Sequence, residues 1–212
     1  MRISATTLES FRLFMQPEQD WMTEDELIAT IRGEFVPNHK VKLGLAFGAV
    51  LETPDRYRGR AGYQCGDFFF AAEVMEPALA EIDRRGIFEV KASKCYGDCT
   101  VVCKADHMLG SHLSEFKTTL SSFNADKYAE SCQWRFMADI LQPSKITYRV
   151  FCLSEDHQTG EIGLNSIETM NLYPYPALHQ DCRDLVEAFR AYVIRKGLDG
   201  VLRERQQRAE AA

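Results

Sequence analysis

The chain has 212 residues, a formal net charge of −6, 45% hydrophobic residues and 26% charged residues. This composition is that of an ordinary globular domain of generous size. It excludes a protein that coats nucleic acid non-specifically, which would be basic overall. No run approaches the roughly 18 apolar residues of a membrane helix, and the N-terminus has no signal-peptide core. We therefore expect a cytoplasmic protein with no membrane partner.

The N-terminal half is predicted to be helical. Apolar residues at helical spacing follow Ser and Thr capping candidates at the start of the chain. Thr23 and Glu26 have the spacing of a capping box, in which each side chain bonds the other residue's backbone N–H. Pro54 is expected to end a later helix. The predicted helices cover 4–14, 23–33, 41–52 and 70–86, and 55–69 is predicted to be a loop with at most one short strand.

The C-terminal half alternates between strands and helices. Strands rich in β-branched and aromatic residues are predicted over 87–93, 99–106, 111–119, 145–154 and 160–173. Helices are predicted over 124–141, capped by Asn124, and over 176–198. This order indicates an α/β fold, with a central mixed β-sheet of about five strands flanked by helices. We expect a single domain over 1–198 and a charged C-terminal tail over 199–212 that frays because it has few apolar anchors.

The candidate site begins with acidic residues on two successive strands. Asp106 ends one strand, and Glu115 and Lys117 lie two apart on the next, so their side chains share a face. A tight turn makes the two strands neighbours. Converging carboxylates repel each other unless a cation lies between them, and such hard oxygen ligands suit Mg²⁺ or Mn²⁺. The structural alternative is a solvated strand face, where acid-x-Lys pairs are common.

A second candidate metal site consists of thiols. Cys95, Cys99 and Cys103 are spaced four residues apart, whereas structural zinc usually requires paired CxxC spacing. On a strand this spacing places Cys99 and Cys103 on one buried face. We therefore favour reduced core thiols over a thiol–metal centre.

The 104–140 segment resembles the PD-(D/E)XK nuclease superfamily, above all its phage-type exonucleases and recombination nucleases. The family pattern is an acid that ends a strand, acid-x-Lys on the next strand, and a helix with Tyr and Gln. The matching segments here are KADHMLG, SEFKTT and DKYAESCQWRF. The resemblance implies a restriction-endonuclease-like fold and a metal bound by Asp106, Glu115 and the Phe116 carbonyl. It also implies that Lys117 is the catalytic base or charge stabiliser and that Gln133 shapes the site.

The chain departs from the family pattern at two positions. In the family helix G-x-x-x-H-x-x-L-E the His is often a further metal ligand, and here Gly48 replaces it. Glu52, one turn along the same face, is our substitute ligand, with Glu73 and Glu76 as weaker candidates. The Tyr that often follows the helical Gln is replaced by Met137, and Tyr128 is its candidate stand-in.

The resemblance implies a Mg²⁺-dependent (or Mn²⁺-dependent) DNA nuclease, an exonuclease more than a restriction enzyme, in a bacterial or phage-infected cell. A single-strand annealing protein and further copies of the chain are implied partners. The alternative is a nuclease fold that has lost catalysis and binds DNA or a protein partner, which Gly48 and the acidic net charge favour.

Basic residues mixed with an aromatic residue suit contact with a nucleic-acid backbone. Such residues are Lys40, Lys42, Arg56, Tyr57, Arg58 and Arg60. The five histidines show no metal-binding spacing, although His107 and His112 flank the candidate site in the sequence.

Overall fold

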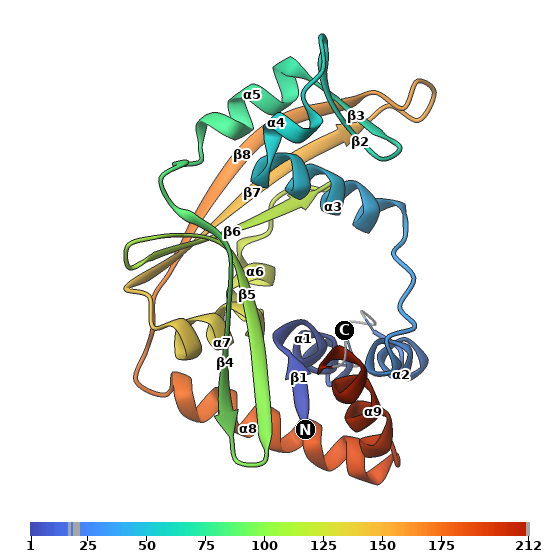
Figure 1. Ribbon diagram of the computed structural model, residues 1–212, viewed down its shortest axis with the longest axis vertical. Helices are drawn as coiled ribbons and strands as arrows, with labels where there is room; N and C mark the ends of the chain where they lie inside the picture. Colours follow the sequence, from blue (N-terminus) through green and yellow to red (C-terminus); the bar gives the residue numbers. More distant parts are fainter. Residues whose placement is uncertain (17, 19–21, 211–212) are drawn as a thin grey trace.

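The computed structural model describes residues 1–16, 18 and 22–210. Its largest sheet is mixed and has six strands in the described part of the chain (Figure 1). The predicted α/β architecture is confirmed, with one strand more than the five expected. The strands of this sheet are β1 Arg2–Ser4, β4 Ile87–Tyr96, β5 Cys99–Leu109, β6 His112–Thr119, β7 Lys145–Glu155 and β8 Ile162–Leu172.

The central strand β5 has different neighbours on its two edges. Antiparallel β4 follows one edge along almost its whole length. On the other edge, parallel β1 pairs with residues 100–102 and antiparallel β6 pairs with residues 107–109. Beyond β6 the sheet continues through parallel β7 and antiparallel β8. The sheet therefore forks between β1 and β6, opposite residues 103–106.

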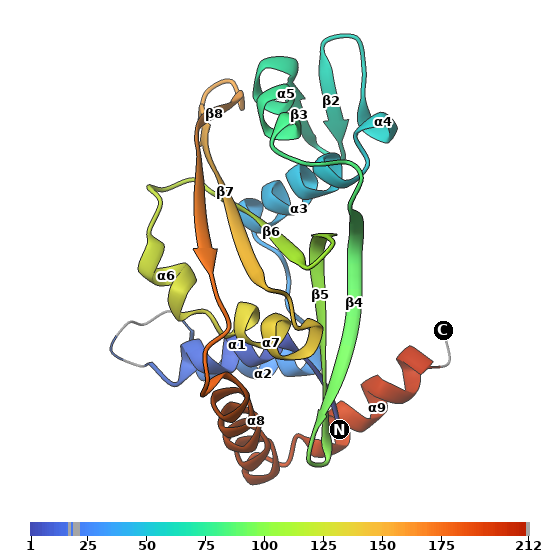
Figure 2. The same cartoon turned by 90° about the vertical axis from the view of Figure 1, so that its left-hand side faces the viewer.

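Helices cover the two ends of the sheet as separate groups (Figures 1 and 2). The upper group in Figure 1 contains α3 His39–Glu52, α4 Pro54–Tyr57, α5 Ala72–Ala80 and the hairpin of β2 Gly62–Cys65 and β3 Phe68–Ala71. The lower group contains α1 Ala5–Phe14, α2 Glu24–Arg32, α7 Cys132–Leu141, α8 Leu178–Arg195 and α9 Asp199–Glu210. Short α6 Ala125–Glu130 precedes α7.

Each helix group has its own apolar cluster. Phe47, Phe70 and Phe151 are fully buried in the upper cluster, and Phe47 contacts both other rings. Phe11 and Phe189 are buried in the lower cluster and pack edge to face. Burial of such rings dominates the stabilisation of a core. The two clusters leave a cleft between them, at the level where β5 and β6 fork.

Several predicted boundaries change in the structure. The three-residue strand β1 was not predicted, because so short a segment shows no alternation. The predicted helix 124–141 divides at Ser131, whose ψ of 135° is extended and whose side chain begins α7 as its N-cap. The predicted loop 55–69 contains α4 and most of the β2–β3 hairpin, and the predicted helix 70–86 shortens to α5. The capping box of Thr23 and Glu26 and the Asn124 cap are confirmed.

The segment predicted to be a charged tail begins with helix α9. Leu202 in its second turn is 4% exposed and belongs to the lower cluster. Helix α9 packs against α2 and β1. Among the described helices, none is long and apolar enough to cross a membrane.

Candidate metal centre and active site

The site forms where β6 leaves β5. Their ladder pairs His107 with Ser114 and is not continued beyond that pair. The Phe116 N–H instead donates to Oδ2 of Asp106 at 2.7 Å. An acidic side chain thus takes the place of a ladder carbonyl and holds the fork open. The Asp106 carboxylate is therefore in direct contact with the Phe116 N–H, whereas the group predicted to belong to the site was the Phe116 carbonyl.

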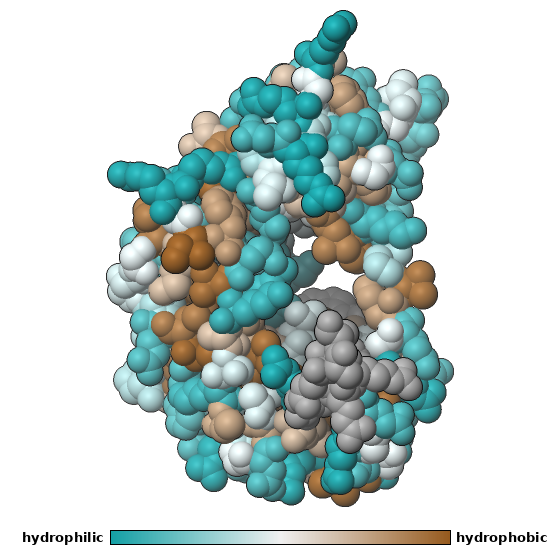
Figure 3. All heavy atoms as spheres, viewed as in Figure 1, coloured by the Kyte–Doolittle hydropathy of each residue, from teal (hydrophilic) through white to brown (hydrophobic). Residues whose placement is uncertain are grey.

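Three carboxylates converge beside this fork. They come from Glu52 at the last position of α3, Glu89 on β4 and Asp106 on β5, and one oxygen of each lies within 4.8 Å of the others. They line a cleft of about 1060 Å³ between the helix groups, and Figure 3 shows the surface hollowed there. Sequence reasoning brought Glu52 and Asp106 into the site but missed Glu89, which no motif marks.

The register of β4 and β5 explains the position of Glu89. The pairs Phe88–His107 and Val90–Ala105 flank it, so Glu89 lies across from Asp106 at a position that the ladder itself skips. Its φ is 58°, in the left-handed region that is costly for a residue with a side chain. Such strained positions occur preferentially at functional sites, where the surrounding structure enforces them. A carboxylate held opposite another carboxylate by a strained backbone is consistent with a cation site.

Glu115 and Lys117 lie next to this cluster and line the same cleft. Oε1 of Glu115 accepts a hydrogen bond from the Lys117 ammonium at 2.7 Å, so the predicted common face is confirmed. The Glu115 side chain is 5% exposed, and its Oε2 is buried without a hydrogen-bond partner. A buried carboxylate oxygen without a partner is costly. A divalent cation would satisfy it, and the neighbouring group of Glu52, Glu89 and Asp106, which does not include Glu115, is an oxygen donor set that fits Mg²⁺ or Mn²⁺.

The pKa values of these carboxyl groups also indicate a cation site. Burial, followed by the hydrogen bond and charge of Glu89, raises the pKa of Glu52 to about 7. Burial also raises the pKa of Glu115 to about 7, against the opposing effect of Lys117. The pKa of Asp106 is raised by burial as well. Raised pKa values make these carboxyl groups easier to protonate, and a bound cation would oppose this effect.

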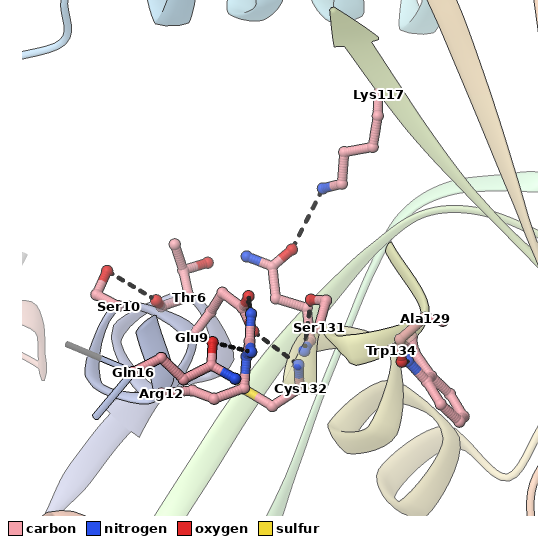
Figure 4. Close-up of polar contacts among 11 residues, drawn as sticks. Thr6, Glu9, Ser10, Arg12, Gln16, Lys117, Ala129, Ser131, Cys132 and Trp134 are labelled. Atoms are coloured by element: carbon pink, nitrogen blue, oxygen red, sulfur yellow. Dashed lines mark hydrogen bonds and ion pairs between the residues drawn. The ribbon is translucent and has the colours of Figure 1, made fainter. Parts of the chain in front are cut away.

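The first turn of α7 positions Gln133 beside the ammonium of Lys117, and Figure 4 shows Ser131, Cys132 and Glu9, which hold this turn. Oγ of Ser131 accepts the Gln133 N–H at 3.2 Å, and Oε2 of Glu9 on α1 accepts the Cys132 N–H at 2.7 Å. The Gln133 amide oxygen then accepts a hydrogen bond from Lys117 at 3.3 Å. Two acceptors from different elements therefore orient the Lys117 ammonium. Sequence reasoning missed Glu9 because its contact spans 123 residues of the chain.

Comparisons with known proteins bear on the fold. No protein-family model matches the sequence, and a search of curated proteins returned no match. Among solved structures, a protein of Eubacterium rectale assigned provisionally as an exonuclease has a TM-score of 0.50, with 10% identity over 92% of this chain and 81% of that chain. The chain has an exonuclease-like fold.

A second solved structure is similar at a lower score. The alkaline exonuclease LHK-Exo of Laribacter hongkongensis has a TM-score of 0.44 and 11% identity, over 100% of this chain and 95% of that chain. The same enzyme in complex with dAMP gives a TM-score of 0.44 and 13% identity, over 99% of this chain and 94% of that chain.

The other residues that the sequence placed in or near the site lie in several different surroundings. Gly48 lines the cleft, and a Cβ placed on it would meet no atom within 4 Å. Glu76 bonds Tyr63 and Arg58, so it does not join the carboxylate cluster. Tyr128 is buried against Tyr148 and lines a smaller neighbouring pocket of about 710 Å³.

The cysteines and histidines form no metal-ligand group in the described residues. Cys99 and Cys103 are buried, as predicted, and burial raises the pKa of Cys103 to about 11, which disfavours the thiolate. His107 is buried and bonds the Asp83 carbonyl at 2.9 Å. His39 contacts Glu155, with 2.7 Å between Nε2 and Oε1.

Most of the lysines that line the cleft are not among the basic residues predicted from the sequence to contact nucleic acid. Lys40 is the predicted basic residue that lines it, whereas Arg58 pairs with Glu76 away from it. Further lysines line the cleft: Lys91, Lys104, Lys117 and Lys127. The five lysines of the cleft lining nearly balance its four carboxylates, in a protein whose net charge is −6.

Proposed function

We propose that the protein is a Mg²⁺- or Mn²⁺-dependent deoxyribonuclease that hydrolyses phosphodiester bonds and acts as an exonuclease. The supporting observation is the convergence of Glu52, Glu89 and Asp106 beside the partnerless Oε2 of Glu115, with Lys117 adjacent. The exonuclease-like fold agrees with this assignment.

The residues divide the chemistry between them. Glu52, Glu89, Asp106 and Glu115 would hold the cation, with the Phe116 carbonyl as a further candidate ligand. A bound divalent ion supplies Lewis-acid stabilisation of the phosphate and lowers the pKa of a bound water. The Lys117 ammonium, oriented by Glu115, stabilises the negative charge that develops on the phosphoryl oxygens or orients the attacking water.

Lys117 suits charge stabilisation better than proton abstraction in the metal-free protein. Although burial alone would lower its pKa, Glu115 and Asp106 raise it above the ordinary lysine value. The ammonium therefore stays protonated at neutral pH. Gln133 accepts one of its hydrogen bonds and is a positioning residue for it.

The test is degradation of end-labelled linear duplex and single-stranded DNA in Mg²⁺ or Mn²⁺. We expect the wild-type protein to release nucleotides from ends and to leave a closed circle intact, and Lys117→Ala and Asp106→Asn to lose at least about a hundredfold in rate. Lys196→Ala, which removes an exposed lysine after α8 that does not line the cleft, is the matched control. Equal degradation by all variants, or none by any across metals and ends, contradicts the proposal.

A binding-only role is the second candidate, and the open space at Gly48 favours it, since one ligand position of the family pattern carries no side chain. Calorimetry with Mn²⁺ separates the two functions. A millimolar or tighter site that Asp106→Asn abolishes supports the nuclease, whereas DNA binding without metal binding supports the accessory role. A single-strand annealing protein and further copies of the chain are the partners we propose to test in either case.

A further inference from the structure

Charged residues face each other in two successive cross-strand positions of the β4–β5 hairpin. Lys91 pairs with Lys104, and Glu89 lies across from Asp106 between the pairs Phe88–His107 and Val90–Ala105. Because side chains two apart on a strand share a face, the two acids and the two lysines lie on the same face, and all four line the cleft. Like charges directly opposite each other destabilise a sheet. On this face, attraction between the two lysines and the two acids offsets the repulsion within each pair.

Lys104 provides the compensation by a direct contact. Its Nζ lies 2.6 Å from Oε1 and 2.7 Å from Oε2 of Glu89. The Lys104 side chain is 47% exposed and that of Glu89 is 34% exposed. The ammonium therefore lies at the open edge of the carboxylate cluster on a flexible stem, and it can leave Glu89 without unpacking the core.

We propose that Lys104 is a resident counter-ion of the metal centre, which competes with the divalent cation for Glu89 and so sets the affinity of the site. The inference rests on the proposed function, because it concerns the same cluster. An ion that takes Oε2 of Glu89 as a ligand removes the acceptor of the Lys104 hydrogen bond, and an ion at Oε1, which accepts no hydrogen bond, still lies close to the positive charge of Lys104. Both effects weaken metal binding compared with a chain that has no ammonium at this position.

The other charges around Glu89 do not replace Lys104 in this role. The Lys117 ammonium donates hydrogen bonds to Glu115 and Gln133. Lys91 forms no ion pair within the part of the chain that the structure describes, and it acts on Glu89 only through its field. Against the effect of burial, this field and the contact with Lys104 both lower the pKa of Glu89. Lys104 is thus the ammonium in contact with the three-carboxylate group.

The experiment is a Mn²⁺ titration at constant pH and ionic strength, with free Mn²⁺ measured by electron paramagnetic resonance. Lys104→Met keeps the stem and removes the charge, and we expect it to bind Mn²⁺ roughly five- to tenfold more tightly. Lys104→Arg keeps the charge and the contact and should stay within about twofold of wild type. Lys91→Met is the matched control and should tighten binding by a smaller factor, because it removes field without contact.

The outcomes separate the inference from the function on which it rests. Wild-type or weaker affinity in Lys104→Met, with normal Mn²⁺ binding by the wild-type protein, overturns the inference and leaves the nuclease proposal standing. It would mean that Lys104 holds Glu89 in place. Absence of Mn²⁺ binding by the wild-type protein and every variant contradicts both. If Lys104→Met does not fold, as judged by thermal unfolding, Lys104→Gln takes its place with the same expectation.

Discussion

Gln133 on α7 and Lys117 on β6 are joined by a hydrogen bond of 3.3 Å from the ammonium to the amide oxygen. The contact links the lower helix group to the strand that carries the acid-x-Lys motif. Because Glu9 and Ser131 fix the first turn of α7, the amide presents its oxygen from a rigid support. Lys117 therefore depends on two elements for its orientation.

Gln133→Leu removes this acceptor at similar volume. We expect the rate of DNA hydrolysis to fall roughly three- to tenfold, since one hydrogen bond contributes about 0.5–1.5 kcal/mol, while Mn²⁺ affinity is unchanged. Gln180→Leu, which removes an exposed amide on α8, is the control and should leave the rate unchanged. A parallel loss of metal binding in Gln133→Leu would show that the residue supports the carboxylates instead.

Gly48→His should supply the ligand that the family pattern has at this position. The residue is helical and lines the cleft, and a Cβ there meets no atom within 4 Å. We expect Mn²⁺ affinity to increase at least about fivefold above pH 7, where the imidazole is neutral. Gly48→Ala shares the gain in helix propensity without the ligand, so equal affinity in the two variants would contradict the expectation.

Metal affinity should rise with pH between about 6 and 8. The pKa values of Glu52 and Glu115 are raised to about 7, so both groups are largely protonated below that pH and must lose protons to bind a cation. Mn²⁺ calorimetry in two buffers of different ionisation enthalpy measures the protons released. Glu52→Gln should lower the number released near pH 6.5, and an unchanged number would show that Glu52 is not a ligand.

The same shifts predict the stability of the metal-free protein. A carboxyl group whose folded-state pKa is raised binds more protons in the native state than in the unfolded state between its two pKa values. The free energy of unfolding should therefore fall as pH rises from about 4.5 to about 7, on account of Glu52 and Glu115. Saturating Mn²⁺ should remove this decline, and urea unfolding at several pH values measures both.

Gly86→Ala should destabilise the fold near the site. A Cβ at this position would lie 1.9 Å from Nε2 of His107, a ring held between Phe88 and Phe116. We expect a loss of about 1–3 kcal/mol in the free energy of unfolding, as is typical of overpacking. Gly48→Ala, which meets open space, is the control and should be neutral or slightly stabilising.

Local features of this protein could be predicted because they depend on residues close together in the chain. The capping box of Thr23 and Glu26 and the common face of Glu115 and Lys117 are of this kind. The burial of Cys99 and Cys103 also follows from strand alternation. In each case the helix or strand period alone decides which side chains meet.

The break at Ser131 shows where local reasoning stops. Residues 124–141 have a helical pattern throughout. Nevertheless, α7 starts as a separate helix at Cys132, and a hydrogen bond from the Cys132 N–H to distant Glu9 stabilises this start. Glu89 could be predicted even less from local sequence, since the pattern of its strand does not distinguish it from a solvent-exposed acid. It joins the cluster because the β4–β5 register places it opposite Asp106.

The sequence by itself determined most of the longer helices and strands, the acid-x-Lys face and the acidic character of the candidate ligands, since these follow from backbone periods and side-chain chemistry. Only the tertiary structure decided which carboxylates converge and which ammonium accompanies them. Glu52, Glu89 and Asp106 come from three elements. Their convergence depends on the strand register, the fork between β5 and β6 and the packing of α3 over it, which are long-range interactions that no local pattern encodes.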